Sequence, residues 1–141
     1  WPAPPPRPAA DGGLVELPVR YQGPDLHEVA RRWGMSPAEV VVRHTSTAFT
    51  VAFCGFSPGF AYLSGLPPRL EVPRRATPRV EVAAGSVGLA GPWCAVYPSA
   101  SPGGWQIIGR TAVPLFHVDR DPPALLVPGT RVRFVDDGSA G

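Results

Sequence analysis

Proline and glycine interrupt this chain so often that long regular elements have little room to form. Twenty prolines and sixteen glycines make up about a quarter of the 141 residues, and both residue types favour turns over regular structure. Between them stand short apolar runs such as AFTVAFCGF, SVGLAG and ALLVPG. This alternation predicts a mainly β fold of short strands joined by turns, built either as a closed barrel or as a sandwich.

The size and charge of the chain exclude several classes of protein. A chain of 141 residues suits one domain with a real core, and 44% hydrophobic residues are too many for general disorder. The net charge is only +2, and no arginine-rich tract is interleaved with aromatic residues, which argues against a nucleic-acid partner. No apolar run approaches the roughly 20 residues of a membrane span, and no signal peptide is visible. We therefore expect a soluble, cytoplasmic protein that acts without a membrane.

The cysteines give no sign of a metal site. Cys54 and Cys94 form no CxxC pair, and the three histidines are well scattered along the chain. A structural zinc site is therefore not expected. Reduced thiols are the expectation, with a single disulfide as the alternative.

Composition divides the chain into three parts. Residues 1–13 are rich in proline and alanine and are expected to form a linker or tail. Residues 14–137 are expected to form the folded domain, and residues 138–141 are expected to form a flexible tail.

Two short helices are predicted near the start of the folded domain. In the segment GPDLHEVARRWGM, Asp25 is a candidate N-cap and Gly34 a stop signal. In the segment SPAEVVVRHTS, Ser36 and Glu39 fit a capping box, with proline at the first helical position. The predicted helices cover about 25–33 and 37–43.

Strands are predicted before and after these helices. A first strand is expected over 14–21, and from Ala48 onward we find no convincing helix. A break is expected at Ala84 and Gly85, and Ser101 to Gly104 are expected to form a turn. The later strand candidates are AFTVAFCGF, ATPRVEV, SVGLAG, WCAVYP, GWQIIGRT, the start of PLFHVDRDPP, and TRVRFVD.

No motif spells out a self-sufficient active site. The chain has no GxSxG, HExxH or GxxxxGK[ST] sequence. His44, at the end of the second predicted helix, has two interpretations: a residue favoured there by the helix dipole, or a general base. His27 and His117 are interpreted as structural.

Arginine supplies the best ligand-binding candidates. Arg79 and Arg110 each lie in a turn environment shaped by glycine and proline, where a guanidinium group can bind a carboxylate with two hydrogen bonds. The alternative is a surface charge or a structural ion pair. Arg69, Arg74 and Arg75 look more like solvated loop charges, although Arg74 or Arg75 could line the same cleft.

Gln106 is the third polar candidate. Strand alternation places Trp105 and Ile107 on one face and Gln106 and Ile108 on the other, so Gln106 needs a hydrogen-bond partner in the protein or in a ligand. The aromatic residues around the Pro-Gly turns, Tyr62 among them, can be core or can line a cleft. The candidate ligand-binding residues are Phe56, Pro58, Phe60, Ser86, Tyr97 and Trp105.

Several segments together resemble one known family. These are GFSPGFAYLSGLP, PRRATPRVEVAAGSVGLAG, YPSASPGGWQIIGRT and LLVPGTRVRFV, with LPVRYQGPDLHEVARRWGMSPAEVVVRHTS before them. They are similar to the allophanate hydrolase subunit 1 family, also known as the 5-oxoprolinase subunit-B family, which includes a Kip-type inhibitor of a sporulation histidine kinase. The resemblance covers roughly Leu14 to Val135. It implies a cyclophilin-like β-barrel and a C-terminal domain whose usual N-terminal companion is absent here.

The resemblance also implies a function. The family's subunit acts with a subunit-C-like (subunit-2-like) partner and a lactam-utilising subunit in an ATP-dependent 5-oxoprolinase, which opens 5-oxoproline to glutamate. No cofactor is expected on this domain itself, ATP being required by the assembled complex, and the isolated domain is expected to be inactive. On this interpretation His44, Arg79, Gln106 and Arg110 line a shared catalytic cleft for a small anionic substrate, without a metal. The alternatives are a regulatory protein that inhibits a histidine kinase and a related urea amidolyase or allophanate hydrolase subunit.

Overall fold

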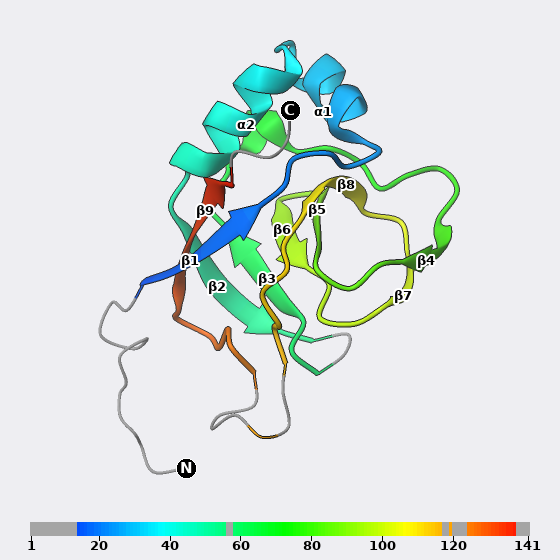
Figure 1. Cartoon of the computed structure of the whole chain (residues 1–141). Helices are drawn as coiled ribbons and strands as arrows, with labels where there is room; N and C mark the ends of the chain where they lie inside the picture. Colours follow the sequence, from blue (N-terminus) through cyan, green and yellow to red (C-terminus); the bar gives the residue numbers. More distant parts are fainter. Residues whose placement is uncertain (1–13, 56–57, 117–118, 120–123, 138–141) are drawn as a thin grey trace.

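A computed structural model describes residues 14–55, 58–116, 119 and 124–137 (Figure 1). It contains two α-helices, one short 3-10 helix and nine strands in these ranges. In chain order they are β1 Leu14–Val19, α1 Leu26–Trp33, α2 Pro37–Ser46, β2 Phe49–Cys54, β3 Ala61–Ser64, η1 Pro68–Leu70, β4 Arg79–Val82, β5 Ser86–Ala90, β6 Trp93–Val96, β7 Ser101–Gly103, β8 Gln106–Arg110 and β9 Arg131–Asp136.

Seven of the strands form one barrel-shaped sheet in the order β1-β9-β2-β3-β6-β5-β8. The first and last strands, β1 and β9, pair in parallel, and the other pairs are antiparallel. The two ends of the sheet meet where Arg20 bridges to Arg110, with reciprocal backbone hydrogen bonds of 2.8 and 3.0 Å. The structure confirms the predicted mainly β class and selects the barrel over the sandwich.

Both predicted helices are present and lie together at one end of the barrel (Figure 1). The capping box of α2 forms as expected: Glu39 N–H donates to the Ser36 hydroxyl, and Ser36 N–H donates to the Glu39 carboxylate. Gly34 ends α1 in the left-handed conformation. Asp25 occupies the N-cap position, but its side chain makes no capping hydrogen bond and turns instead to distant partners. Within the described residues, neither helix is long and apolar enough to cross a membrane.

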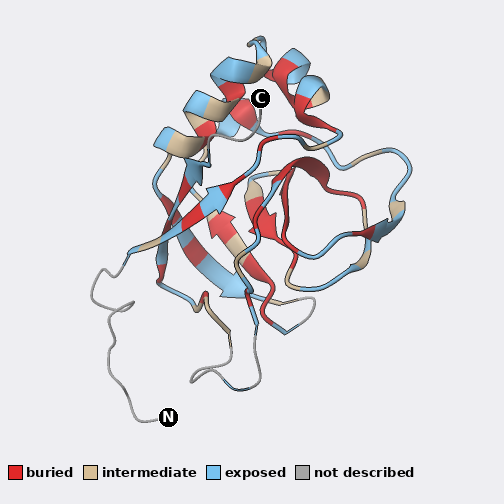
Figure 2. Ribbon diagram, viewed as in Figure 1, coloured by how far each residue is buried: buried red, intermediate tan, exposed pale blue. Residues whose placement is uncertain are grey.

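Buried side chains form two clusters. Figure 2 marks the buried residues in red along the ribbon. The main core fills the barrel and extends under α1 and α2, where Trp33 and Val40 are buried. The second, which we call the aromatic cluster, contains Phe60, Tyr97 and Trp105 with small apolar neighbours. Trp105 and Ile107 belong to the aromatic cluster and Ile108 to the main core, which confirms the predicted alternation along β8.

Two predicted elements differ from the structure. Ser101 to Gly103 form the strand β7 rather than part of a turn, because they pair with β4 in a separate two-stranded sheet that we call the β4–β7 sheet. A pairing between distant segments of this kind leaves no local sequence signal. The strand expected to begin near Pro114 is reduced to a single bridge between Phe116 and Ala124 among the described residues.

Candidate functional site

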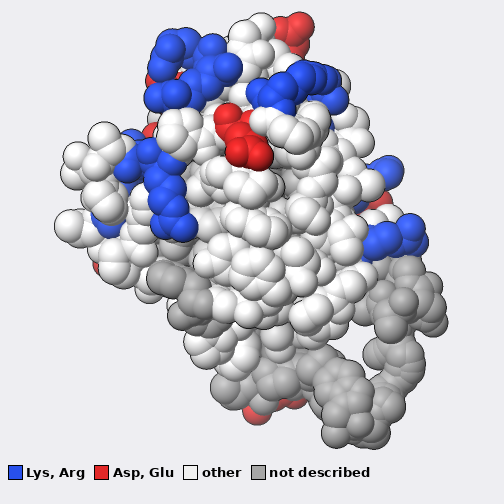
Figure 3. All heavy atoms as spheres, turned by 180° about the vertical axis from the view of Figure 1, so that it is seen from behind, with Lys and Arg blue, Asp and Glu red and all other residues white. Residues whose placement is uncertain are grey.

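Two cavities flank the point where the barrel closes. The larger has a volume of about 600 Å³ and the smaller of about 400 Å³. Arg20 and Arg110, which form the closing bridge, line both of them. The rear face of the molecule shows basic side chains in separate groups around a mostly uncharged surface (Figure 3). This face therefore carries no continuous basic patch.

Arg110 is the cation best placed to meet a ligand. Its side chain is exposed, and its Nε–H donates to the carbonyl oxygen of Ala84 at 3.0 Å. That hydrogen bond fixes the position of the guanidinium group. Across residues 14–55, 58–116, 119 and 124–137, its two terminal nitrogens form no other hydrogen bond or ion pair, so they can donate to a bound anion.

Arg79 lies at the smaller cavity, but its charge is already engaged. Its terminal nitrogens donate to both carboxylate oxygens of Asp25, at 2.7 and 3.0 Å, and Arg75 donates to the same carboxylate at 3.1 Å. The Ile107 N–H adds a fourth hydrogen bond at 2.7 Å. Arg79 therefore acts chiefly to hold the β4–β7 sheet against the barrel.

The buried carboxylate of Asp25 remains ionised in this network. Burial opposes its charge, but the hydrogen bonds from Arg79 and Ile107 and the positive charges of Arg79 and Arg75 outweigh that effect and lower the pKa of Asp25 below its ordinary value. The same contact raises the pKa of Arg79. Asp25, Arg75 and Arg79 thus form a fixed group of paired charges beside the smaller cavity.

Gln106 is buried, and its amide donates to the carbonyl oxygen of Pro73 at 3.0 Å. This confirms the expectation that a polar side chain at this position needs a partner, and the partner is the protein backbone. Gln106 lines neither of the two cavities. Its role here is to tie the loop before β4 to strand β8.

His44 lies in the main core rather than at a cavity. Its Nδ1 is 2.6 Å from the Tyr21 hydroxyl, its Nε2 is 3.4 Å from the Cys94 thiol, and its ring stacks on Phe134 with centroids 4.5 Å apart. Complete burial lowers the pKa of His44 to about 3, so the ring is neutral at physiological pH. The expected four-residue cleft is therefore not assembled: Arg79 and Arg110 meet at the smaller cavity, while His44 and Gln106 lie elsewhere.

The candidate ligand-binding residues lie in different parts of the structure and do not form one site. Ser86 lines the smaller cavity and Tyr97 the larger one. Phe60 and Trp105 pack in the aromatic cluster, with ring centroids 5.7 Å apart, and Pro58 is exposed. Phe56 and His117 lie outside the described residues, and His27 is exposed on α1.

Sequence reasoning missed Arg20 and the ionic role of Asp25. Arg20 follows the first strand as Arg110 ends β8, so the signal that singled out Arg110 could have found it. The Asp25 carboxylate resembles an ordinary cap in the sequence, because its partners lie 50 to 82 residues away.

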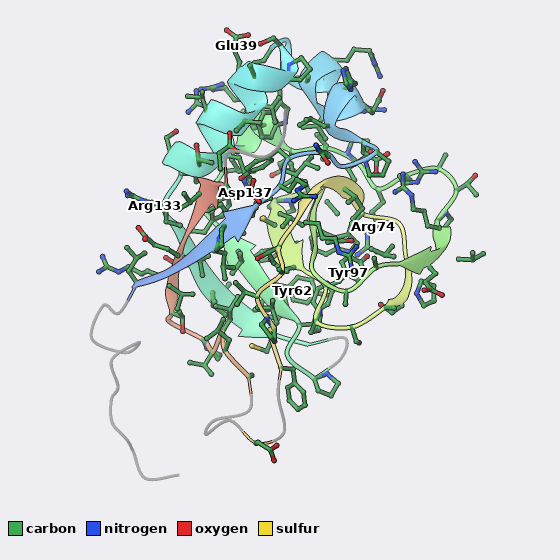
Figure 4. The ribbon with its side chains drawn as sticks, in the orientation of Figure 1. Glu39, Tyr62, Arg74, Tyr97, Arg133 and Asp137 are labelled. Carbon is green, nitrogen blue, oxygen red and sulfur yellow. The ribbon has the colours of Figure 1, made fainter. Side chains whose placement is uncertain are left out.

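Next to the aromatic cluster, three partly exposed rings form what we call the aromatic ladder. Phe53 and Tyr62 stack with centroids 4.5 Å apart, and Trp93 meets Phe53 edge-on at 5.1 Å. Phe53 is 44% exposed. Tyr62 and Tyr97 come from neighbouring parts of the barrel, with Arg74 beyond them on the side of the β4–β7 sheet (Figure 4). Arg74 lies 5.8 Å from the Trp105 ring, a cation–π contact that sequence alone did not indicate.

Comparison with known proteins gives a consistent result. The family model described as carboxyltransferase domain, subdomain C and D, matches residues 1–126. A protein of Escherichia coli O157:H7, named as the subunit-B protein of 5-oxoprolinase, is 54% identical over 86% of this chain and 57% of its own length. A protein of the same name from Bacillus subtilis is 47% identical over 86% of this chain and 52% of its own length. The chain thus spans little more than half the length of these relatives.

A solved structure shares the fold. The crystal structure of a conserved uncharacterized protein from Pyrococcus horikoshii superposes with a TM-score of 0.82 at 44% identity. The match covers 87% of this chain and 58% of that one.

Proposed function

Because the chain belongs to the family of carboxyltransferase domains, subdomains C and D, we propose that it acts as a subunit of an ATP-dependent 5-oxoprolinase that opens 5-oxoproline to glutamate. The observation that carries this proposal is the 54% and 47% identity to two proteins named as 5-oxoprolinase subunits. The subunit works in the cytoplasm with a subunit-C-like partner and a lactam-utilising subunit, and it is inactive alone.

The smaller cavity is the proposed substrate site in this chain. 5-Oxoproline is a small ring with one carboxylate, and the terminal nitrogens of Arg110 can bind that carboxylate with two parallel hydrogen bonds. Ser86 and the backbone around Ile107 and Gly109 line the same cavity and offer polar groups for a lactam. The residues of this chain orient the substrate and exclude water from one face of it.

The residues present do not fit ATP. The chain has no lysine and no glycine-rich phosphate loop of the GxxxxGK[ST] type. We therefore assign ATP to another subunit of the complex, where phosphorylation of the lactam oxygen would create a leaving group. Water would then add to the phosphorylated ring carbon, and cleavage of the C–N bond would open the ring with its nitrogen leaving as the amine. Hydrolysis of the resulting acyl phosphate would give glutamate and phosphate.

Glutamate formation by the assembled complex tests this proposal. Co-expressed with both partner subunits, the chain should support conversion of 5-oxoproline to glutamate that depends on ATP. Arg110→Ala should lower kcat/KM roughly 10- to 100-fold, mainly through KM, because a charge-assisted hydrogen bond is worth about 1.5–3 kcal/mol. The matched control is Arg133→Ala, an exposed arginine on β9 (Figure 4), which should leave the rate unchanged. A complex without turnover would refute the subunit role, and a fully active Arg110→Ala variant would refute the site alone.

The aromatic ladder favours a second candidate function, a regulatory protein that docks on a sensor histidine kinase. Exposed aromatic rings that stack on one another are typical of protein-binding surfaces. On this alternative the chain alone should slow kinase autophosphorylation, and Phe53→Ser should weaken that effect while Arg110→Ala does not. Inhibition that is indifferent to Phe53 would exclude this surface.

A further inference from the structure

We propose that the smaller cavity recognises the amide edge of a lactam through two further side chains, those of Glu81 and Ser86. The Glu81 carboxylate accepts a hydrogen bond from the ring N–H, and the Ser86 hydroxyl donates one to the ring carbonyl oxygen. This inference rests on the proposed function for the identity of the substrate. It adds the two groups that select a cyclic amide, beyond the carboxylate that Arg110 binds.

The hydroxyl of Ser86 is buried without a partner. Ser86 is 5% exposed and lines the smaller cavity. Its backbone is engaged, since its N–H donates to the Ala83 carbonyl at 3.2 Å and its carbonyl accepts from the Tyr97 N–H at 2.9 Å. Its hydroxyl forms no hydrogen bond within the part of the chain that the structure describes. A buried hydroxyl costs free energy unless it is hydrogen-bonded, so this donor favours a ligand that can accept.

Ser86 and Arg110 are neighbours on one wall of the cavity. They are opposed partners in the antiparallel pairing of β5 with β8, and both line the smaller cavity. Their side chains therefore lie on the same face of the sheet, with Cβ atoms about 5 Å apart. A ligand whose carboxylate binds Arg110 thus brings the groups next to that carboxylate within reach of the Ser86 hydroxyl.

Glu81 supplies a carboxylate at the mouth of the cavity. It is the only acid among the described residues that line this cavity, and it is exposed. Its neighbour Val80 is 92% exposed, and successive side chains of a strand alternate, so Glu81 points to the other side of β4. Glu81 forms no hydrogen bond or ion pair with any described residue. A carboxylate only accepts hydrogen bonds, so it matches an N–H and not a carbonyl.

A lactam presents a donor and an acceptor on one edge. Ring closure holds the amide cis, so the N–H and the carbonyl oxygen point to the same side, whereas open-chain secondary amides are almost always trans. In 5-oxoproline the N–H also lies between the carboxylate and the carbonyl. Arg110, Glu81 and Ser86 offer one complementary group for each of the three. The cavity therefore selects a cyclic amide over an open-chain amide that carries the same groups.

Titration of the 141-residue chain with three matched ligands tests this recognition. They are 5-oxoproline, its lactone analogue 5-oxotetrahydrofuran-2-carboxylate, in which oxygen replaces the N–H, and N-acetylalanine, which is an open-chain amide. In two-dimensional amide NMR, 5-oxoproline should shift the signals of Val82 and Ser86, which line the cavity. It should bind roughly tenfold or more tightly than either comparison ligand, because a hydrogen bond to a charged group is lost in each of them.

Two variants separate recognition from a structural effect. A glutamine side chain can donate to the lactone ring oxygen, so Glu81→Gln should lower the lactam-to-lactone affinity ratio roughly fivefold or more. Glu71→Gln, at an exposed glutamate outside both cavities, should leave the ratio unchanged. Ser86→Ala should weaken lactam and lactone alike, because both present the same carbonyl. Damage to the fold would weaken both ligands without changing their ratio.

The outcomes separate this inference from the proposed function. Equal binding of lactam and lactone, an unchanged ratio in Glu81→Gln, or an absence of shifts at millimolar 5-oxoproline would each overturn the inference. Turnover by the assembled complex beside any of these results would leave the subunit role intact. Selective lactam binding by the chain without turnover by the complex would refute the subunit role alone. The ligand comparison needs no variant, so an unfolded variant does not prevent the test.

Discussion

The guanidinium group of Arg79 donates two hydrogen bonds, of 2.7 and 3.0 Å, to the carboxylate of Asp25, which lies 54 residues earlier in the sequence. Asp25 lies at the start of α1, and Arg79 begins β4. The same carboxylate accepts the Ile107 N–H from β8. One buried anion therefore joins the first helix, the β4–β7 sheet and the barrel.

Removal of this anion should loosen all three elements. We expect Asp25→Asn to lower the free energy of unfolding by about 2 kcal/mol. This loss is smaller than for a fully buried ion pair, because the Arg79 side chain remains partly exposed to solvent. Urea denaturation measures the change. Glu28→Gln, which breaks an exposed carboxylate–arginine pair on α1, is the control and should have no measurable effect. Equal stability of both variants would show that the Asp25 network is no stronger than a surface pair.

Acid should destabilise the protein through His44. Its folded-state pKa of about 3 lies below the ordinary 6.5, so the unfolded chain binds the extra proton, and stability falls as the pH drops from 6.5 toward 3. His44→Gln, which keeps a polar group for Tyr21, should flatten this dependence in urea denaturation between pH 7 and pH 4.5. His27→Gln, at an exposed position, should keep the wild-type slope. An unchanged pH dependence of stability in His44→Gln would show that another titratable group causes it.

Gly85 should tolerate substitution far less well than Gly91. Both have a positive φ, which costs an alanine roughly 1 kcal/mol or more. A Cβ on Gly85 would also strike the Thr111 carbonyl, whereas one on Gly91 would meet nothing within 4 Å. Thermal denaturation should show a clearly larger fall in Tm for Gly85→Ala than for Gly91→Ala. Equal falls would mean that the segment around Gly85 can move aside.

The two thiols should differ in reactivity. Cys54 is exposed and Cys94 fully buried, and both are free. Burial raises the pKa of each thiol, much more for Cys94, which disfavours the reactive thiolate. A thiol reagent should label only Cys54 in the native protein and both residues in denaturant, with Cys54→Ser as the control for the first reaction. Rapid native labelling of Cys94 would contradict the closed core.

What could be predicted from the sequence depended on the range of the interactions. The helix ends were predictable because Ser36 and Glu39 cap α2 through contacts three residues apart. The contacts of Asp25 with Arg79 and the pairing of β7 with β4 were not, because their partners are distant in sequence. Arg110 was identified from its turn environment, whereas the inward direction of His44 depends on the packing of Phe134 from the last strand. The family resemblance predicted the barrel but not which side chains meet at its cavities.

The parallel pairing of β1 with β9 also bears on how the chain folds. β1 begins at Leu14 and its partner β9 at Arg131, far apart in the sequence, so the barrel cannot close until β9 has been synthesised. Contacts between remote segments slow folding, because a long loop must be ordered before they form. Until β9 arrives, the edges of β1 and β2 stay unpaired and open to association with other chains. The β1–β9 pairing that closes the finished barrel thus forms late in folding, and the incomplete barrel is prone to aggregation until it forms.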